Sequence, residues 1–213
     1  MPMETPELSD GELARQTQAG SLPAFDELVR RHQDRVFRFV RQSCRADADA
    51  AEITQETFIR AFRVVNRYDP TRPFHAWLLG IARHKTLDYH RAYPAAIEAA
   101  AVEAGTADDP GEELARVEEH HALWRLARLH LSETQFQALW LRYVEDLDLA
   151  DTARVLGKTV THTKVILFRA RQILASRWDR AQGAGKHAIP TAPPCPTPPT
   201  PPSLKAPPHA KLA

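Results

Sequence analysis

Hydrophobic residues recur at a helical spacing along much of the chain. Between residues 51 and 67 they return every three to five positions, and after a short interruption the same spacing resumes at Phe74. Such spacing places apolar side chains on one stripe of an α-helix. Residues 68–73, Tyr-Asp-Pro-Thr-Arg-Pro, cannot continue a helix, because proline lacks an amide donor and disfavours the αR conformation in the residue before it. The pattern therefore predicts two helices joined by a short, stiff loop.

Two further helices are expected before this pair. Ser9 and Glu12 have the spacing of a capping box, which marks a helix start. A longer helix is expected from Ser21 to about Ser43, with an inner face made of Phe25, Leu28, Val29, His32, Val36, Phe39 and Val40. Residues 8–92 are thus predicted to form one small helical domain.

Residues 112–181 predict a second helical domain that contains a helix-turn-helix. Ser132 can cap a helix, and residues 149–156 form a short apolar-striped segment. Gly157 suits a tight turn that needs positive φ, and Thr159 can cap the next helix. That last helix has an inward-facing stripe made of Thr163, Leu167, Ala170 and Leu174.

Two segments interrupt the helical pattern. Residues 93–111 are acidic and broken by proline and glycine, which is typical of a flexible linker whose simplest role is a soluble tether. Residues 182–213 are rich in proline and are expected to be a disordered tail. The predicted fold class is therefore all-α: two small helical domains, a flexible linker between them and a disordered proline-rich tail.

Composition excludes several classes of function. The 213 residues carry a formal net charge of +1, so the chain as a whole does not indicate a nucleic-acid partner. Its two cysteines lack metal-ligand spacing, and no apolar run has the length of a secretory signal or a membrane span. Glu52 and Glu56 are paired carboxylates without a nucleophile or metal motif. We expect a cytoplasmic protein that is not an enzyme, has no metal or cofactor, and does not insert into a membrane.

Charge is nevertheless concentrated locally. Residues 60–91 contain seven Arg and Lys against two acids, with aromatic residues between them. Such a surface suits single-stranded nucleic acid, because cations follow phosphates and rings stack on bases. The alternative is that the rings belong to the core, which spacing favours for Phe58, Phe62 and Trp77. Both interpretations stay open for the residues in and beside the loop, Tyr68, Arg72 and His75.

Two runs in this half carry a family resemblance. EITQETFIRAF at residues 52–62, followed by FHAWLLGIAR at residues 74–83, resembles region 2 of the sigma-70 family of transcription initiation factors, in its extracytoplasmic-function (ECF) form. The resemblance implies that Glu52, Gln55 and Glu56 dock on the clamp coiled coil of core RNA polymerase. It also implies minus-10 DNA contacts from Tyr68, Arg72, Phe74, His75, Arg83 and Arg91, with Arg83 on a helix face free to meet phosphates.

The helix-turn-helix is similar to region 4 of ECF sigma factors, which reads the minus-35 element. The resemblance and the exposed positions imply DNA contacts from Arg154, Lys158, Thr161, His162, Lys164, Val165 and Arg169. Thr152 and Thr163 depart from the family pattern and place hydroxyls on a core face, where each needs a hydrogen-bond partner. Val165 and Ile166 replace polar residues on or near the exposed face, and Val165 could contact a thymine methyl.

The expected function is that of an ECF-type sigma factor. Such a factor binds core RNA polymerase at its clamp coiled coil and flap, recognises promoter DNA and directs promoter-specific initiation, and it often has an anti-sigma factor as a partner. A first alternative is a sigma-like regulator that binds polymerase or an anti-sigma protein without initiating, as the altered recognition helix would permit. A second is a stand-alone helix-turn-helix repressor, which leaves residues 8–92 without a use.

Overall fold

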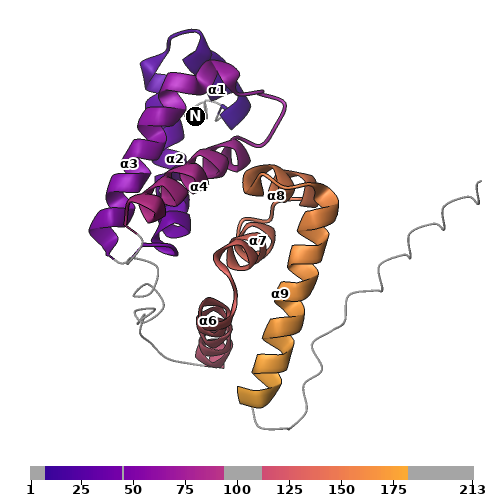
Figure 1. The fold of residues 1–213 in the computed structure, drawn as a ribbon. Helices are drawn as coiled ribbons and strands as arrows, with labels where there is room; N and C mark the ends of the chain where they lie inside the picture. Colours follow the sequence, from indigo (N-terminus) through magenta and orange to yellow (C-terminus); the bar gives the residue numbers. More distant parts are fainter. Residues whose placement is uncertain (1–7, 45, 94–111, 182–213) are drawn as a thin grey trace, which may run out of the picture.

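The structure is a computed structural model that describes residues 8–44, 46–93 and 112–181. Within these ranges the chain is helical and has no β-strand (Figure 1). The linker expected at residues 93–111 lies, apart from Tyr93, outside the described residues, and so does the expected tail at residues 182–213. None of the described helices is both long enough and apolar enough to cross a lipid bilayer.

The first half is a bundle of four helices, α1 (Asp10–Gln18), α2 (Leu22–Arg41), α3 (Asp47–Val64) and α4 (Phe74–Ala92). A short 3₁₀ turn, η1 (Val65–Arg67), follows α3. The predicted capping box is present, because the Ser9 amide donates to Glu12 Oε2 at 2.8 Å and the Ser9 hydroxyl accepts from the Glu12 amide at 3.3 Å. The inward stripes of these helices meet in one core that includes Leu28, Val36, Val40, Phe74 and Leu78.

The second half contains α6 (Glu112–His130), α7 (Glu133–Tyr143), α8 (Leu149–Leu156) and α9 (Val160–Ala181). Ser132 caps α7 through a capping box with Gln135, and Gly157 ends α8 in the left-handed conformation at φ 63°. The Thr159 hydroxyl accepts from the His162 amide at 3.2 Å and so caps α9. The helix-turn-helix predicted from the sequence is confirmed.

The two unusual threonines are both buried and both satisfied. The Thr152 hydroxyl donates to the carbonyl of Asp148 at 2.7 Å, and the Thr163 hydroxyl donates to the carbonyl of Thr159 at 3.0 Å. Each hydroxyl donates to the backbone carbonyl four residues earlier, which lies within reach of a threonine side chain in a helix. The core of the helix-turn-helix therefore tolerates these hydroxyls without a buried unpaired group.

The two halves are packed against each other. Figure 1 shows α8 beside α4, and hydrogen bonds also join Gln42 and Ser43, which directly follow α2, to α6 and α7. The sequence pattern predicted two domains on a tether and gave no sign of this contact.

A glutamine at the end of α1 holds the segment that leads into the loop at residues 68–73. Its side-chain amide donates to the carbonyl of Val65 at 2.9 Å and to that of Tyr68 at 2.8 Å. We expect Gln18→Ala to lower the free energy of unfolding by about 1–3 kcal/mol, because two carbonyls in a partly buried place lose their donor. Urea unfolding followed by circular dichroism measures the change.

Gln16→Ala is the matched control, since Gln16 lies on the same helix and is exposed. It should leave the stability within about 0.5 kcal/mol of the wild type. Equal losses from the two substitutions would mean that the Gln18 contacts contribute nothing measurable.

Candidate nucleic-acid and polymerase interfaces

The surface of the helix-turn-helix is polar and accessible. The four buried residues of α9 predicted to face inward (Thr163, Leu167, Ala170 and Leu174) orient the opposite side of this helix outward. All seven residues predicted to contact minus-35 DNA are exposed: Arg154, Lys158, Thr161, His162, Lys164, Val165 and Arg169. A shallow hollow between the start of α7 and the start of α9 is lined by several of them, including Lys158, His162 and Arg169.

The two apolar residues at the middle of the recognition helix have different surroundings. Val165 is 40% exposed, so its methyl groups are accessible on the outer face. Ile166 is buried, which corrects the expectation that both residues replace polar side chains on or near the exposed face. The reason is helical geometry: Ile166 lies next to the inward-facing Leu167 and about three positions from Thr163, which puts it at the edge of the core stripe.

The loop at residues 68–73 is supported from beneath by aromatic side chains. Tyr68 is only 4% exposed. Its ring packs edge-on against Phe74, with ring centroids 5.2 Å apart, and in a tilted arrangement against Trp77, with centroids 5.1 Å apart. Its hydroxyl donates to the carbonyl of Arg72, and burial raises the pKa of that hydroxyl to about 12. Tyr68 and Phe74 are therefore core residues here, and neither ring has a face open for a base.

The exposed part of the same loop is small and structured. Asp69 Oδ1 accepts from the Thr71 amide at 3.0 Å and from the Thr71 hydroxyl at 2.7 Å, and these bonds lower the pKa of the Asp69 carboxyl. Arg72 is exposed and lies 3.2 Å from Asp69 as an ion pair. The loop thus presents one guanidinium on a rigid turn.

Three other residues assigned to minus-10 DNA lie along α4, in different environments. Arg91 is exposed and pairs with Asp88 at 3.1 Å. His75 is half-buried, and its pKa is lowered first by this burial and then by the positive charge of Arg35. Arg83 is only 8% exposed, and its Nε donates to Oε1 of Gln137 on α7 at 2.9 Å.

The expectation that Arg83 is free to meet phosphates is therefore wrong for this arrangement. Arg83 does lie on the side of α4 away from Leu78, as the helical spacing predicted, but that side is covered by the second half. The sequence carries no local signal for this cover, since the residues of α7 and α8 that supply it are more than 50 positions away.

The residues predicted to bind polymerase share one accessible face of α3. Glu52, Gln55 and Glu56 are all exposed, and Glu56 pairs with Lys85 at 2.8 Å. Gln55 also lies at the edge of an apolar hollow between α2 and α3, which sequence reasoning missed; it is lined by Leu22, Phe25, Phe58, Ile59 and Phe62, among others. Phe62, predicted to be a core residue, is 41% exposed there, with its ring 5.0 Å from that of Phe25.

The signal for this hollow was available in the sequence. Leu22 and Ile59 are large apolar residues outside the inward stripes of their helices, and both are exposed. Exposed apolar side chains that gather in one place, with polar residues around them, indicate a binding surface for another protein.

Comparisons with known proteins assign each half of the chain to a region of one family. Residues 28–93 match the family description Sigma-70 region 2, and residues 124–174 match Sigma-70, region 4; together they span more than half of the 213 residues. The chain is 31% identical over 169 residues to the ECF RNA polymerase sigma factor BldN of Streptomyces coelicolor, covering 77% of this chain and 64% of BldN. It is also 25% identical over 156 residues to the ECF RNA polymerase sigma factor SigM of Bacillus subtilis, covering 73% of this chain and 95% of SigM.

Solved structures share the fold. The chain is similar to CnrH, solved in complex with the cytosolic domain of CnrY, with a TM-score of 0.58, 24% identity, and 80% of this chain and 97% of the CnrH chain covered. It is similar at a TM-score of 0.55 and 18% identity to the sigma factor RpoE from Bartonella quintana, over 73% of this chain and 96% of that one. The region 2 match contains α3, the loop and α4, and the region 4 match contains the helix-turn-helix. The chain therefore belongs to the sigma-70 family and has curated relatives of the ECF type.

Proposed function

We propose that this chain is an ECF-type sigma factor that binds core RNA polymerase and directs promoter-specific initiation of transcription. One observation carries the proposal: a single chain combines the exposed basic face of a helix-turn-helix with an exposed, mixed acidic and apolar face on α3. A repressor needs only the first of these faces. We place the activity in the cytoplasm, and the chemistry of RNA synthesis belongs to the polymerase.

Recognition of the minus-35 element is assigned to the start of α9. In a helix-turn-helix this segment enters the major groove, where flanking cations contact phosphates and central side chains meet base edges. Lys158, Lys164 and Arg169 are exposed cations suited to phosphates, and Thr161 and His162 are exposed near the first turn. Val165 can pack against a thymine methyl, which is a form of direct readout.

Docking on polymerase is assigned to α3. Glu52, Gln55 and Glu56 provide charge and hydrogen-bonding groups, and the neighbouring hollow accepts apolar side chains from the clamp coiled coil. Apolar anchors in a pocket with a polar rim are the usual composition of a protein interface. The flap would contact the second half.

Promoter opening is assigned to the loop at residues 68–73 and the start of α4. Unstacking a base costs a few kcal/mol, and capture of the base by the protein offsets this cost without hydrolysis. We distribute this role among the residues according to their exposure. Arg72 and Arg91 are exposed and can contact the strand directly, whereas Tyr68 and Phe74 act by holding the loop rigid from beneath. An anti-sigma protein, as in the RpoE complex with the anti-sigma factor NepR, is proposed as a further partner.

The test is transcription in vitro from a promoter library, with core RNA polymerase in the presence and absence of the purified protein. Start sites that appear only with the protein are the expected result. Glu56→Lys should weaken binding to core about tenfold, because it replaces an attractive charge with a repulsive one at the interface. Asp34→Lys makes the same charge change at an exposed position of α2 that is assigned to no interface, and it should leave core binding unchanged.

Two results would contradict the proposal in different ways. Binding to core without any new transcript would favour a regulator that occupies polymerase without initiating. Equal effects of the two charge reversals would remove α3 from the polymerase interface even if transcription were observed.

A further inference from the structure

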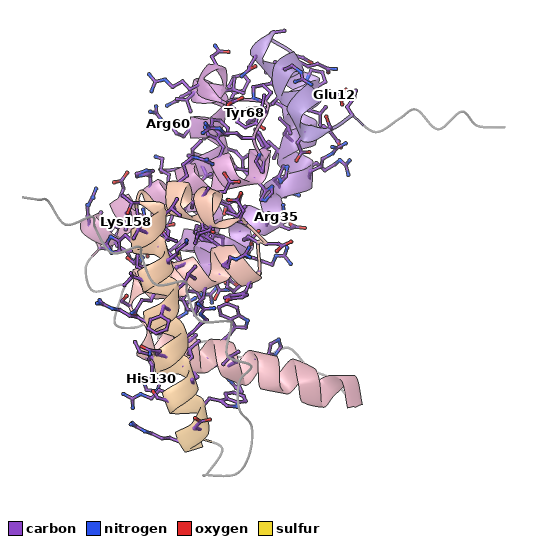
Figure 2. The ribbon with its side chains drawn as sticks, turned by 90° about the vertical axis from the view of Figure 1, so that its right-hand side faces the viewer. Glu12, Arg35, Arg60, Tyr68, His130 and Lys158 are labelled. Carbon is purple, nitrogen blue, oxygen red and sulfur yellow. The ribbon has the colours of Figure 1, made fainter. Side chains whose placement is uncertain are left out.

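The helix α1 lies against the segment that leads into the loop at residues 68–73. It packs on the 3₁₀ turn η1, which precedes the loop, and on α4, which follows it. Figure 2 labels Glu12 of α1 and Tyr68 of the loop at the same end of the first half. The residues assigned above to DNA and to polymerase all lie outside α1, so this helix has no assigned role.

The last residue of α1 fixes the backbone at the start of the loop. Gln18 Nε2 donates to the carbonyls of Val65 and Tyr68, at 2.9 and 2.8 Å. The Val65 carbonyl also accepts from the Tyr68 amide at 2.9 Å, so the three groups are bonded to one another. Carbonyls at the end of a helix lack partners within it, and one side chain from α1 serves two of them here.

The first turn of α1 touches the middle of the loop. A Cβ atom added at Gly11 would lie 3.0 Å from the carbonyl oxygen of Pro70, which is closer than most Cβ atoms approach any neighbour. Gly11 is a helical residue without a positive φ, and in a helix alanine is favoured over glycine by up to about 1 kcal/mol. The close approach of two backbones, and not the conformation of Gly11, therefore explains a glycine here.

The helix α1 is itself held in place on α2. Arg31 Nη1 donates to the carbonyl of Leu8 at 2.7 Å and lies 3.2 Å from Asp10 Oδ1. His32 Nε2 lies 2.7 Å from the other Asp10 oxygen, and Leu13 is buried in the core. Because α1 is anchored at its start and along its inner face, the parts of the loop that it contacts are held with it.

The loop is also held from its inner side. The Tyr68 hydroxyl donates to the carbonyl of Arg72, and the Arg72 amide donates to the carbonyl of Asp69 at 3.1 Å. The contacts from α1 fall on Tyr68 and Pro70, on either side of Asp69. The two sets of contacts together restrict the backbone that carries the exposed side chain of Arg72.

We propose that α1 sets the conformation of the loop at residues 68–73 for minus-10 recognition, with Gln18 and Gly11 as its positioning residues. The inference rests on the proposed function, because it takes this loop as the element that captures a base. Neither residue contacts DNA in this role. A loop held in its bound conformation loses less conformational freedom on binding. A released loop binds more weakly, in proportion to the time it spends in other conformations.

Two substitutions at Gln18 separate its hydrogen bonds from its size. Gln18→Met keeps an unbranched side chain of similar length but donates nothing, whereas Gln18→Lys restores a donor for the two carbonyls. Gly11→Ala tests the second contact. The matched controls are Gln16→Met, at an exposed position of α1, and Gly80→Ala, on α4, where an added Cβ meets nothing within 4 Å.

The loop is measured first, without DNA or polymerase. Hydrogen–deuterium exchange followed by mass spectrometry reports local opening of the backbone in peptides that cover residues 65–73. Gln18→Met should raise the exchange rate there about fivefold, the factor expected for the loss of one typical hydrogen bond, and leave peptides from α9 unchanged. Gln18→Lys and the two controls should exchange like the wild type.

DNA recognition is measured second, with the full-length protein bound to core RNA polymerase. Fluorescence anisotropy gives the affinity for a single strand with the minus-10 element of the strongest promoter recovered from the library, and for strands in which each base is replaced in turn. Gln18→Met and Gly11→Ala should bind the element about fivefold more weakly and discriminate less between bases. Gln18→Lys and the controls should keep the wild-type affinity and base preference.

A general loss of stability does not imitate this result. It would lower the affinity for a duplex that carries only the minus-35 element as well, whereas we expect that affinity to stay within about twofold of the wild type in every variant. Gly11→Ala adds a second distinction, because alanine favours the helix and yet the strand should bind more weakly.

The possible results separate this inference from the proposed function. Unchanged exchange at residues 65–73 in Gln18→Met, or faster exchange with wild-type affinity and base preference, would overturn the positioning role of α1, while transcription with core polymerase could still succeed. Wild-type strand binding by Gly11→Ala would remove Gly11 from that role. If the wild type directs no transcript, the proposed function fails, and the link from this loop to minus-10 DNA fails with it even where exchange responds as expected.

Discussion

Replacing Phe74 with alanine should lower the free energy of unfolding by about 3–5 kcal/mol, the loss typical of a large aromatic side chain removed from a core. Phe74 is 1% exposed, and its ring contacts His32, Tyr68 and Trp77, with centroids 5.2 to 5.5 Å away. Through its contact with Tyr68, the Phe74 ring supports the loop at residues 68–73. Urea unfolding followed by circular dichroism gives the change.

The same substitution separates two roles for this ring. Phe168→Ala is the control, since Phe168 is a phenylalanine in a helix that is 53% exposed, and its loss should change stability by less than about 1 kcal/mol. If Phe74→Ala folds with wild-type stability but fails to open promoters, the ring is a base contact and its buried position does not describe the working state.

A double charge reversal on the recognition helix should produce the largest functional effect. Lys164→Glu with Arg169→Glu should weaken binding to a duplex that carries the minus-35 element by about 100-fold, corresponding to about 2.8 kcal/mol. Both cations are exposed on the outer face of α9, where each would approach a phosphate, and reversal turns two attractions into two repulsions. Anisotropy at fixed salt, with the strongest promoter recovered from the library, measures the loss.

The control makes the same charge change at the other end of the helix. Arg177→Glu with Arg180→Glu also reverses two exposed cations on α9, but beyond the segment assigned to the groove. We expect a change of less than about threefold, because screening at physiological salt limits the reach of surface charges to about 8 Å. Equal losses from both pairs would show that attraction is not localised at the helix-turn-helix and would favour an interaction module over a promoter reader.

Rules that relate residues close together in the sequence were sufficient to predict the helices and their ends. Capping at Ser9, Ser132 and Thr159 follows from side chains that reach amides only three positions away, and Gly157 takes the one conformation that an added Cβ would oppose. The outer face of the helix-turn-helix was likewise predictable from its inward stripe, except for Ile166 at the edge of that stripe. These are interactions between neighbours in sequence, so the sequence states them directly.

The loop and α4 show where such rules stop. The position of Tyr68 in the sequence is compatible both with a core residue and with a ring that stacks on a base. Only the packing of Phe74 and Trp77 around it shows that it is buried. Arg83 lies on the outer side of its own domain, as predicted, yet it is buried by a helix from elsewhere in the chain. Helical spacing indicates which side of a helix is apolar, but it does not indicate what lies against the polar side.

The sequence by itself therefore determined the all-α fold, the family and the two surfaces that point away from the rest of the chain, on α3 and on α9. Tertiary structure alone decided that Tyr68 and Phe74 support the loop and that the halves meet through Arg35, Arg83 and Glu145. The physical reason is that these features depend on pairs of residues far apart in sequence, whose contact is favoured by burial and hydrogen bonding only after the helices have packed.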